Sequence, residues 1–228
     1  MQIALKFNYI TGIFIKELKN RFLCEVNIEG ENVICYVPSS CHLSNFLQLE
    51  GKQVLLIPTE SNKARTKFSV FAIRHKKSYI ILNSSVANKA ILANLSNRRF
   101  SFLGKRKIFL KEHTVNRYKS DVFISDTNSI IEIKSVISTA TTAVFPTVYS
   151  ERALIQLQQL RKLLAEGFKV YFFIVSLNPY IKEIKINKDT EFNCELNKCI
   201  EKGMIVKAYS CKLSNQGILI HKEIKLKN

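Results

Sequence analysis

Two short apolar runs on either side of a polar turn constrain the fold of this chain more than any other feature. Residues 120–124 are Ser-Asp-Val-Phe-Ile, residues 130–134 are Ile-Ile-Glu-Ile-Lys, and residues 125–129 between them have the composition of a turn. Because β-branched and aromatic residues favour strands, the segment is predicted to form an antiparallel hairpin. A two-residue and a four-residue loop give the same register, in which Asp121 faces Glu132.

This register brings together three charged side chains. Lys134, two residues beyond Glu132, shares the face of the predicted pair. Two facing carboxylates repel each other unless a cation or a shared proton lies between them. Aspartate followed by Glu-x-Lys is the pattern of the PD-(D/E)xK phosphodiesterases. Asp121 and Glu132 would hold Mg²⁺ or Mn²⁺, with the Ile133 carbonyl as a further oxygen ligand.

In this hypothesis Lys134 positions the attacking water or neutralises charge that develops on the phosphate. Asp121, Glu132 and Lys134 are therefore the predicted catalytic residues. The motif is short, and a solvated Glu-Lys pair on an exposed strand is the alternative interpretation.

The sequence around the hairpin resembles the sugar fermentation stimulation protein A (SfsA) family. Family motifs correspond to Glu112, Tyr118-Lys119-Ser120-Asp121-Val122, Glu132-Ile133-Lys134-Ser135-Val136 and Phe145-Pro146-Thr147-Val148-Tyr149-Ser150-Glu151-Arg152-Ala153. Arg21-Phe22-Leu23 and Lys202-Gly203-Met204-Ile205-Val206 extend the resemblance over nearly the whole chain.

The resemblance implies a small OB-like β-barrel over residues 1–84 and a restriction-endonuclease-like mixed α/β domain over residues 85–228. It also implies DNA binding, a regulatory link to sugar utilisation, and Glu112 as a third, helix-borne metal ligand. The alternative for Glu112 is a solvated acid within a basic segment.

The charge of the chain is strongly positive, with 35 Lys and Arg residues against 18 Asp and Glu residues and a formal net charge of +17. Such a charge attracts polyanions. Basic residues gather at 98–119 and at 63–77, where Phe68 and Phe71 lie among them. A lysine-rich composition that reflects an AT-rich genome is the alternative interpretation. The predicted nucleic-acid contacts are Lys105, Arg106, Lys107, Arg117, Lys119, Arg152 and Gln156.

Hydrophobic periodicity divides the chain into a β-rich half and a mixed half. The first half is predicted to contain short strands at Tyr9–Lys16, Phe22–Ile28, Asn32–Val37, Gln53–Pro58, Phe68–His75 and Ser78–Leu82, a number that permits a small barrel. Helices are predicted at Val86–Asn94, at Val148–Glu166 with a stripe of Leu154, Leu157, Leu160 and Leu164, and at Thr190–Lys202. Strands are predicted at Lys169–Val175, Ile205–Leu213 and Ile218–Lys225.

Several classes of protein are disfavoured. No run approaches the roughly 18 apolar residues of a membrane span, and the first residues do not have the pattern of a signal peptide. The six cysteines include no Cys-x-x-Cys pair, which favours reduced thiols in a cytoplasmic protein.

Three functional hypotheses follow. The first is an SfsA-type DNA-binding protein with a Mg²⁺- or Mn²⁺-dependent phosphodiesterase site. The second is a non-catalytic DNA-binding regulator of sugar metabolism whose acidic site is structural or vestigial. The third is a nuclease or processing factor directed at RNA.

Overall fold

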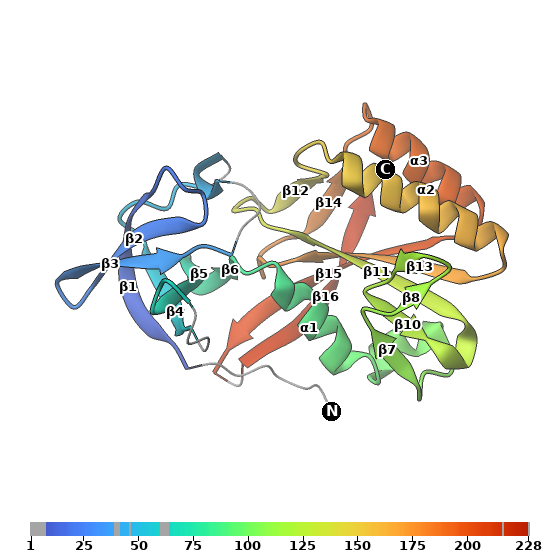
Figure 1. Cartoon of the computed structure of the whole chain (residues 1–228), viewed down its shortest axis with the longest axis horizontal. Coiled ribbons are helices and arrows are strands. Elements are labelled where there is room, and N and C mark those ends of the chain that lie inside the picture. Colours follow the sequence, from blue (N-terminus) through green and yellow to red (C-terminus); the bar gives the residue numbers. More distant parts are fainter. Residues whose placement is uncertain (1–7, 39–41, 46, 60–63, 216, 228) are drawn as a thin grey trace.

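The N-terminal half of the chain is a small closed β-barrel. The computed structural model describes residues 8–38, 42–45, 47–59, 64–215 and 217–227, so the predicted basic residue Lys63 lies outside the described residues. The sheet has the order β3-β2-β1-β4-β5-β6, and a parallel pairing of Tyr36 with Ser69 joins β3 to β5 and closes the barrel (Figure 1). Its elements are β1 (Ile10–Glu17), β2 (Leu23–Ile28), β3 (Glu31–Tyr36), η1 (Leu43–Asn45), β4 (Gln53–Pro58), β5 (Phe68–His75) and β6 (Ser78–Ile81).

Alternating burial explains why these residues form a barrel. Cys24 and Val26 of β2 are buried, while their neighbours Leu23, Glu25 and Asn27 are only partly buried. Gly12 allows β1 to cross β2 closely, because a Cβ atom there would lie 2.6 Å from Val26 Cγ1 and 2.9 Å from Asn27 O. The OB-like barrel and the six predicted strands are therefore confirmed, with ends shifted by one residue in places. Five of the strands close the barrel, and β6 pairs with β5 beyond the closure. Phe71 is wholly buried, so it is not part of the basic surface on which it was expected.

The C-terminal half is built on a mixed sheet with the order β12-β14-β16-β15-β13-β11-β10-β7. Strands β11, β13 and β15 run parallel, whereas β10 pairs antiparallel with β11, and β16 pairs antiparallel with β15. The predicted mixed α/β architecture is confirmed. The strands are β7 (Phe109–Lys111), β10 (Val122–Ile124), β11 (Ser129–Val136), β12 (Thr142–Phe145), β13 (Lys169–Ser176), β14 (Glu183–Ile186), β15 (Ile205–Ser214) and β16 (Gly217–Lys227).

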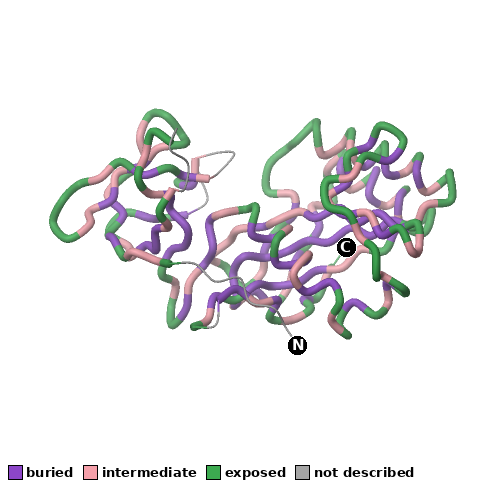
Figure 2. Tube along the Cα trace, turned by 60° about the horizontal axis from the view of Figure 1, so that its bottom comes forward, coloured by how far each residue is buried: buried purple, intermediate pink, exposed green. Residues whose placement is uncertain are grey.

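Helices cover both faces of this sheet. On one face α2 (Glu151–Ala165) and α3 (Glu191–Glu201) lie side by side and pack on Phe172 and Ile174 of β13 (Figure 1). On the other face α1 (Ser85–Asn94) and the 3₁₀ segment η2 (Arg98–Leu103) pack on Phe173. Successive residues of β13 thus enter two different cores, as expected for a central strand. Figure 2 shows buried chain along the strands and exposed chain at the turns and outer helix faces.

Some predicted boundaries and contacts were wrong. Helix α2 begins at Glu151 and not at Val148, because Ser150 has an extended backbone and its hydroxyl accepts a hydrogen bond from the Ala153 N–H at 3.2 Å. Its buried residues are Leu157, Leu160 and Leu163, whereas the predicted Leu154 and Leu164 are only partly buried, although Leu164 packs against the same core. The analysis also missed β7, β12, β14 and the two-stranded ribbon of β8 (Thr114–Val115) and β9 (Tyr118–Lys119), all of which are too short for a clear periodicity.

Among the described residues, no helix combines the length and the hydrophobicity that crossing a membrane requires.

Candidate functional site

The predicted hairpin forms with the predicted register. Val122 pairs with Ile131, and Ile124 pairs with Ser129, around a loop that contains the 3₁₀ turn η3 (Ser125–Thr127). Asn128 ends this loop in the left-handed conformation with φ +50°, which asparagine tolerates better than most residues. Asp121 lies directly before β10, where the same register places it opposite Glu132.

Both oxygens of Asp121 accept hydrogen bonds from the protein. The Ile133 N–H donates to Oδ2 at 2.7 Å, and the Asn88 side-chain amide of helix α1 donates to Oδ1 at 2.7 Å. Burial and the nearby charge of Glu132 raise the pKa of Asp121 to about 6, against the opposing effects of these donors and Lys134. The charge of Glu132 thus opposes ionisation of Asp121, in the direction that the predicted pairing of two carboxylates requires.

Glu132 is almost completely buried, with 2% of its surface exposed. Its Oε1 accepts a hydrogen bond from Lys134 Nζ at 2.7 Å, and its Oε2 accepts one from the Tyr118 hydroxyl at 2.5 Å. Burial and Glu132 raise the pKa of Tyr118 far above its ordinary value, so this hydroxyl stays protonated and continues to donate. Lys134 Nζ also donates to Gln156 Oε1 of helix α2 at 2.6 Å.

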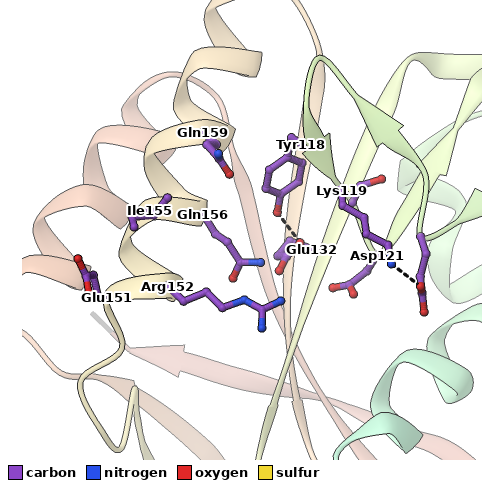
Figure 3. A pocket seen from close by; sticks show the side chains of 11 residues that line it. Tyr118, Lys119, Asp121, Glu132, Glu151, Arg152, Ile155, Gln156 and Gln159 are labelled. Carbon is purple, nitrogen blue, oxygen red and sulfur yellow. Dashed lines mark hydrogen bonds and ion pairs between the residues drawn. The ribbon is translucent and has the colours of Figure 1, made fainter.

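An open cavity of about 630 Å³ lies over this network. Figure 3 shows Arg152 and Gln156 of α2 extending into it from one side, while Tyr118, Lys119 and Asp121 come from the other. The first turn of α2 also faces this region, and the positive end of a helix dipole favours anions. The cavity therefore combines an acidic floor, formed by Asp121 and Glu132, with walls that carry two cations, Lys119 and Arg152, and two further acids, Glu112 and Glu151.

Glu112 does not lie on a helix, and this part of its prediction was wrong. It lies at a bend after β7 with φ +50°, lines the same cavity, and is exposed. Its carboxylate pairs with Lys119 Nζ at 2.7 Å, which lowers the pKa of Glu112. Within the part of the chain that the structure describes, no group of three or more His, Cys, Asp and Glu side chains is placed to hold a metal.

The predicted basic contacts have different surroundings. The Arg106 guanidinium donates hydrogen bonds to backbone carbonyls after helix α1, including Leu95 O at 2.6 Å and Asn97 O at 3.0 Å. These bonds stabilise the C-terminal end of that helix. The N–H groups of Arg106 are thus already used by backbone carbonyls, whereas the sequence analysis predicted that they bind a phosphate of nucleic acid. Lys105 pairs with Asp126 at 3.2 Å and is still largely exposed. Lys107 and Arg117 are exposed, and Arg117 lies in the turn between β8 and β9.

The sequence analysis missed Tyr118 and Asn88 as parts of the site. Tyr118 was read only as part of a family motif, and its short strand β9 has no clear pattern. Asn88 lies inside a helix, where asparagine is unfavourable, and that is the signal that could have identified it.

Comparisons with known proteins agree with this architecture. Residues 18–82 match the family model described as the SfsA N-terminal OB domain, and residues 85–217 match the one described as the sugar fermentation stimulation protein RE domain. A sugar fermentation stimulation protein homolog from Natranaerobius thermophilus is 28% identical over 218 residues, which cover 92% of this chain and 90% of the relative. A homolog from Pelagibacter ubique is 27% identical, with 96% and 97% covered.

A solved structure has the same fold. The SfsA protein of Pyrococcus furiosus, determined in complex with Ca²⁺, superposes with a TM-score of 0.86 at 19% identity, and the match covers 100% of both chains. Two family models together match most of the sequence, and both domains have the expected architecture. This chain therefore belongs to the sugar fermentation stimulation protein (SfsA) family.

Proposed function

We propose that this protein binds DNA and carries a divalent-metal phosphodiesterase site formed by Asp121, Glu132 and Lys134. The observation that carries the proposal is the pair of facing carboxylates, one of them buried, with a lysine on the same strand face and an open cavity above into which Lys119 and Arg152 bring positive charge. A protein gains little from two repelling carboxylates unless a cation uses them.

The donor set fits a hard divalent cation. Asp121 and Glu132 offer carboxylate oxygens, and Mg²⁺ or Mn²⁺ sites commonly use one or two carboxylates with water and substrate phosphate as the other ligands. The related Pyrococcus furiosus protein was solved with Ca²⁺, another oxygen-preferring cation. When bound, such an ion supplies Lewis-acid polarisation of a phosphoryl oxygen and a lower pKa for a bound water.

The remaining side chains have roles that follow from their positions. Lys134 is held between Glu132 and Gln156, so its charge is fixed beside the buried carboxylate, where it would neutralise a phosphate oxygen bound next to Asp121 and Glu132. Arg152 extends from the first turn of α2 and would bind a neighbouring phosphate with two donors. Lys119 would add charge from the opposite wall.

One observation favours the second candidate, a non-catalytic DNA-binding regulator. Each of the four carboxylate oxygens of Asp121 and Glu132 already accepts a hydrogen bond from a protein donor, which is also what a purely structural network requires. The two candidates differ in whether a metal ion and a substrate displace any of these donors.

A nuclease assay on single-stranded and double-stranded DNA and RNA, with Mg²⁺, Mn²⁺ or EDTA, tests the proposal. We expect metal-dependent cleavage of DNA, lost in EDTA and reduced at least about 100-fold by Lys134→Ala, while Mn²⁺ binding persists. Lys169→Ala, an exposed lysine at the far end of β13, is the matched control. DNA binding without cleavage under every condition would support the regulator, and cleavage restricted to RNA would support the third hypothesis.

A further inference from the structure

A second cavity lies where the barrel meets the C-terminal domain. Its walls come from the β5–β6 hairpin of the barrel and from the end of the β15–β16 hairpin (Figure 1). The two parts are in direct contact, since β6 packs on β15 and the Ile81 N–H donates to Leu177 O at 3.1 Å. The cavity has a volume of about 730 Å³. It shares no lining residue with the cavity over Asp121 and Glu132, which we call the acidic site. We refer to it as the seam cavity.

Three cations line the seam cavity, and no described acid does. Arg74 and Lys77 come from the barrel, and Lys212 comes from β15. All three are exposed, and none forms an ion pair with a described carboxylate. Like charges from two domains that converge on one concave surface repel each other and attract anions.

One histidine outside the lining responds to a cation of the seam cavity. Burial, and then the charges of Lys212, Lys222 and Arg99, lower the pKa of His221 on β16. Lys212 is one of the three cations of the seam cavity, so its charge acts beyond the cavity itself.

The rest of the lining suits a nucleotide unit. The Arg74 guanidinium lies over the Tyr79 ring, 5.1 Å from its centroid, which holds this cation in place. Tyr79 is partly exposed, and Leu213 and Leu219 add apolar surface beside it. Phosphate charges bind to Lys and Arg, and bases or sugars bind to aromatic and apolar surface.

We propose that the seam cavity is a second binding site for the phosphate backbone of a nucleic acid, with Arg74, Lys77 and Lys212 as its phosphate ligands. The site uses both domains, so a bound strand would bridge the barrel and the α/β domain. This inference rests on the nucleic-acid binding proposed above and does not depend on cleavage. A free nucleotide has the same chemistry as one unit of the strand, and the experiment distinguishes the two.

The test is the affinity for a short labelled single-stranded DNA, measured by fluorescence anisotropy over a range of salt concentrations. For Lys77→Glu/Lys212→Glu we expect affinity to fall about tenfold or more and the salt dependence to become shallower by about one to two units of the log–log slope. The matched control is Lys169→Glu/Lys202→Glu, which has the same change in net charge. Lys169 begins β13, and Lys202 directly follows α3. Both lie near the start of β15, whereas Lys212 lies near its end.

Three outcomes would overturn the inference. The first is that both double variants lose affinity equally, which indicates only a net-charge effect. The second is unchanged affinity in the seam variant. The third is that AMP binding is lost in the seam variant while DNA binding is retained. Lys77→Gln/Lys212→Gln repeats the test with less perturbation if the glutamate variant does not fold, as monitored by circular dichroism. If the wild-type protein binds no nucleic acid, the proposed function fails as well, and Mn²⁺ titration then shows whether the acidic site persists.

Discussion

The acidic site and the seam cavity both gather like charges, but they differ in how those charges are neutralised. At the acidic site, the carboxylates of Asp121 and Glu132 accept hydrogen bonds from groups of the protein itself. The donors are the Tyr118 hydroxyl, the Asn88 amide, the Lys134 ammonium group and the Ile133 N–H. At the seam cavity, Arg74, Lys77 and Lys212 have no acidic partner among the described residues and face solvent. The difference follows from burial, because a buried charge must be paired or hydrogen-bonded, whereas an exposed charge relies on water and counterions.

The largest expected effect on stability comes from Asp121→Asn without metal. The pKa of Asp121 in the folded protein is about 6, against an ordinary value of 3.8, so the folded state holds a proton that the unfolded chain releases earlier. The stability that this group contributes to the wild-type protein is fully present below pH 3.8 and is lost as the pH rises through 6. At about 1.4 kcal/mol per pKa unit, the loss in free energy of unfolding is roughly 3 kcal/mol.

The side-chain amide that this substitution introduces would keep both hydrogen bonds, because the Asn88 amide can turn to accept from it. We therefore expect Asp121→Asn to be at least as stable as wild type at pH 8 in EDTA, as measured by urea unfolding at pH 5 and pH 8. A variant that is strongly destabilised at pH 8 would show that the charge of Asp121 is structural and would favour the regulator hypothesis.

Binding of Mn²⁺ is expected to change the free energy of unfolding slightly less. If Asp121 and Glu132 hold Mn²⁺, the wild-type protein should gain about 2.7 kcal/mol in free energy of unfolding at a Mn²⁺ concentration about 100 times the Kd. Asp121→Asn should abolish this gain, and Lys77→Gln/Lys212→Gln should leave it intact because the seam cavity shares no lining residue with the acidic site. Thermal unfolding across a Mn²⁺ titration provides the measurement, and the absence of any gain in wild type would contradict the metal site.

Removing one of the hydrogen-bond donors of the acidic site should lower the free energy of unfolding by a somewhat smaller amount. Tyr118→Phe leaves the buried Glu132 Oε2 without its hydroxyl partner, so we expect a loss of about 1–3 kcal/mol in urea unfolding. Tyr149→Phe, at a tyrosine that is 73% exposed, is the matched control and should change stability little. Equal stability of the two variants would mean that water replaces the Tyr118 hydroxyl and that the acidic site is more open than its contacts indicate.

The smallest effect on stability is expected from a substitution at the seam cavity. Lys212→Gln removes an exposed cation that has no described acidic partner, so stability should stay within about 0.5 kcal/mol of wild type. The same change should raise the pKa of His221, because Lys212 is one of the charges that lower it. An NMR titration of His221 measures this shift. An unchanged pKa would mean that the positive potential of the seam cavity does not extend to β16.

The sequence by itself determined the architecture and the centre of the acidic site. Strand periodicity places Asp121 opposite Glu132 for either of the two predicted loop lengths, and the structure confirms that register. The barrel strands, the three helices and the central strand β13 were also predictable, because each has a periodic pattern and a clear terminator such as Gly167 or Gly203. Whether the acidic site binds metal and cleaves DNA stays a prediction.

Only the tertiary structure decided which side chains surround these residues. Asn88 lies 33 residues before Asp121, and Gln156 lies 22 residues after Lys134, so no local pattern could assign these contacts. Arg106 looked like a phosphate ligand, but its donors are used by carbonyls after α1. The seam cavity likewise exists only because β6 packs on β15. The physical reason is that backbone periodicity is local, whereas pairing, burial and electrostatic potential depend on residues brought together from distant parts of the chain.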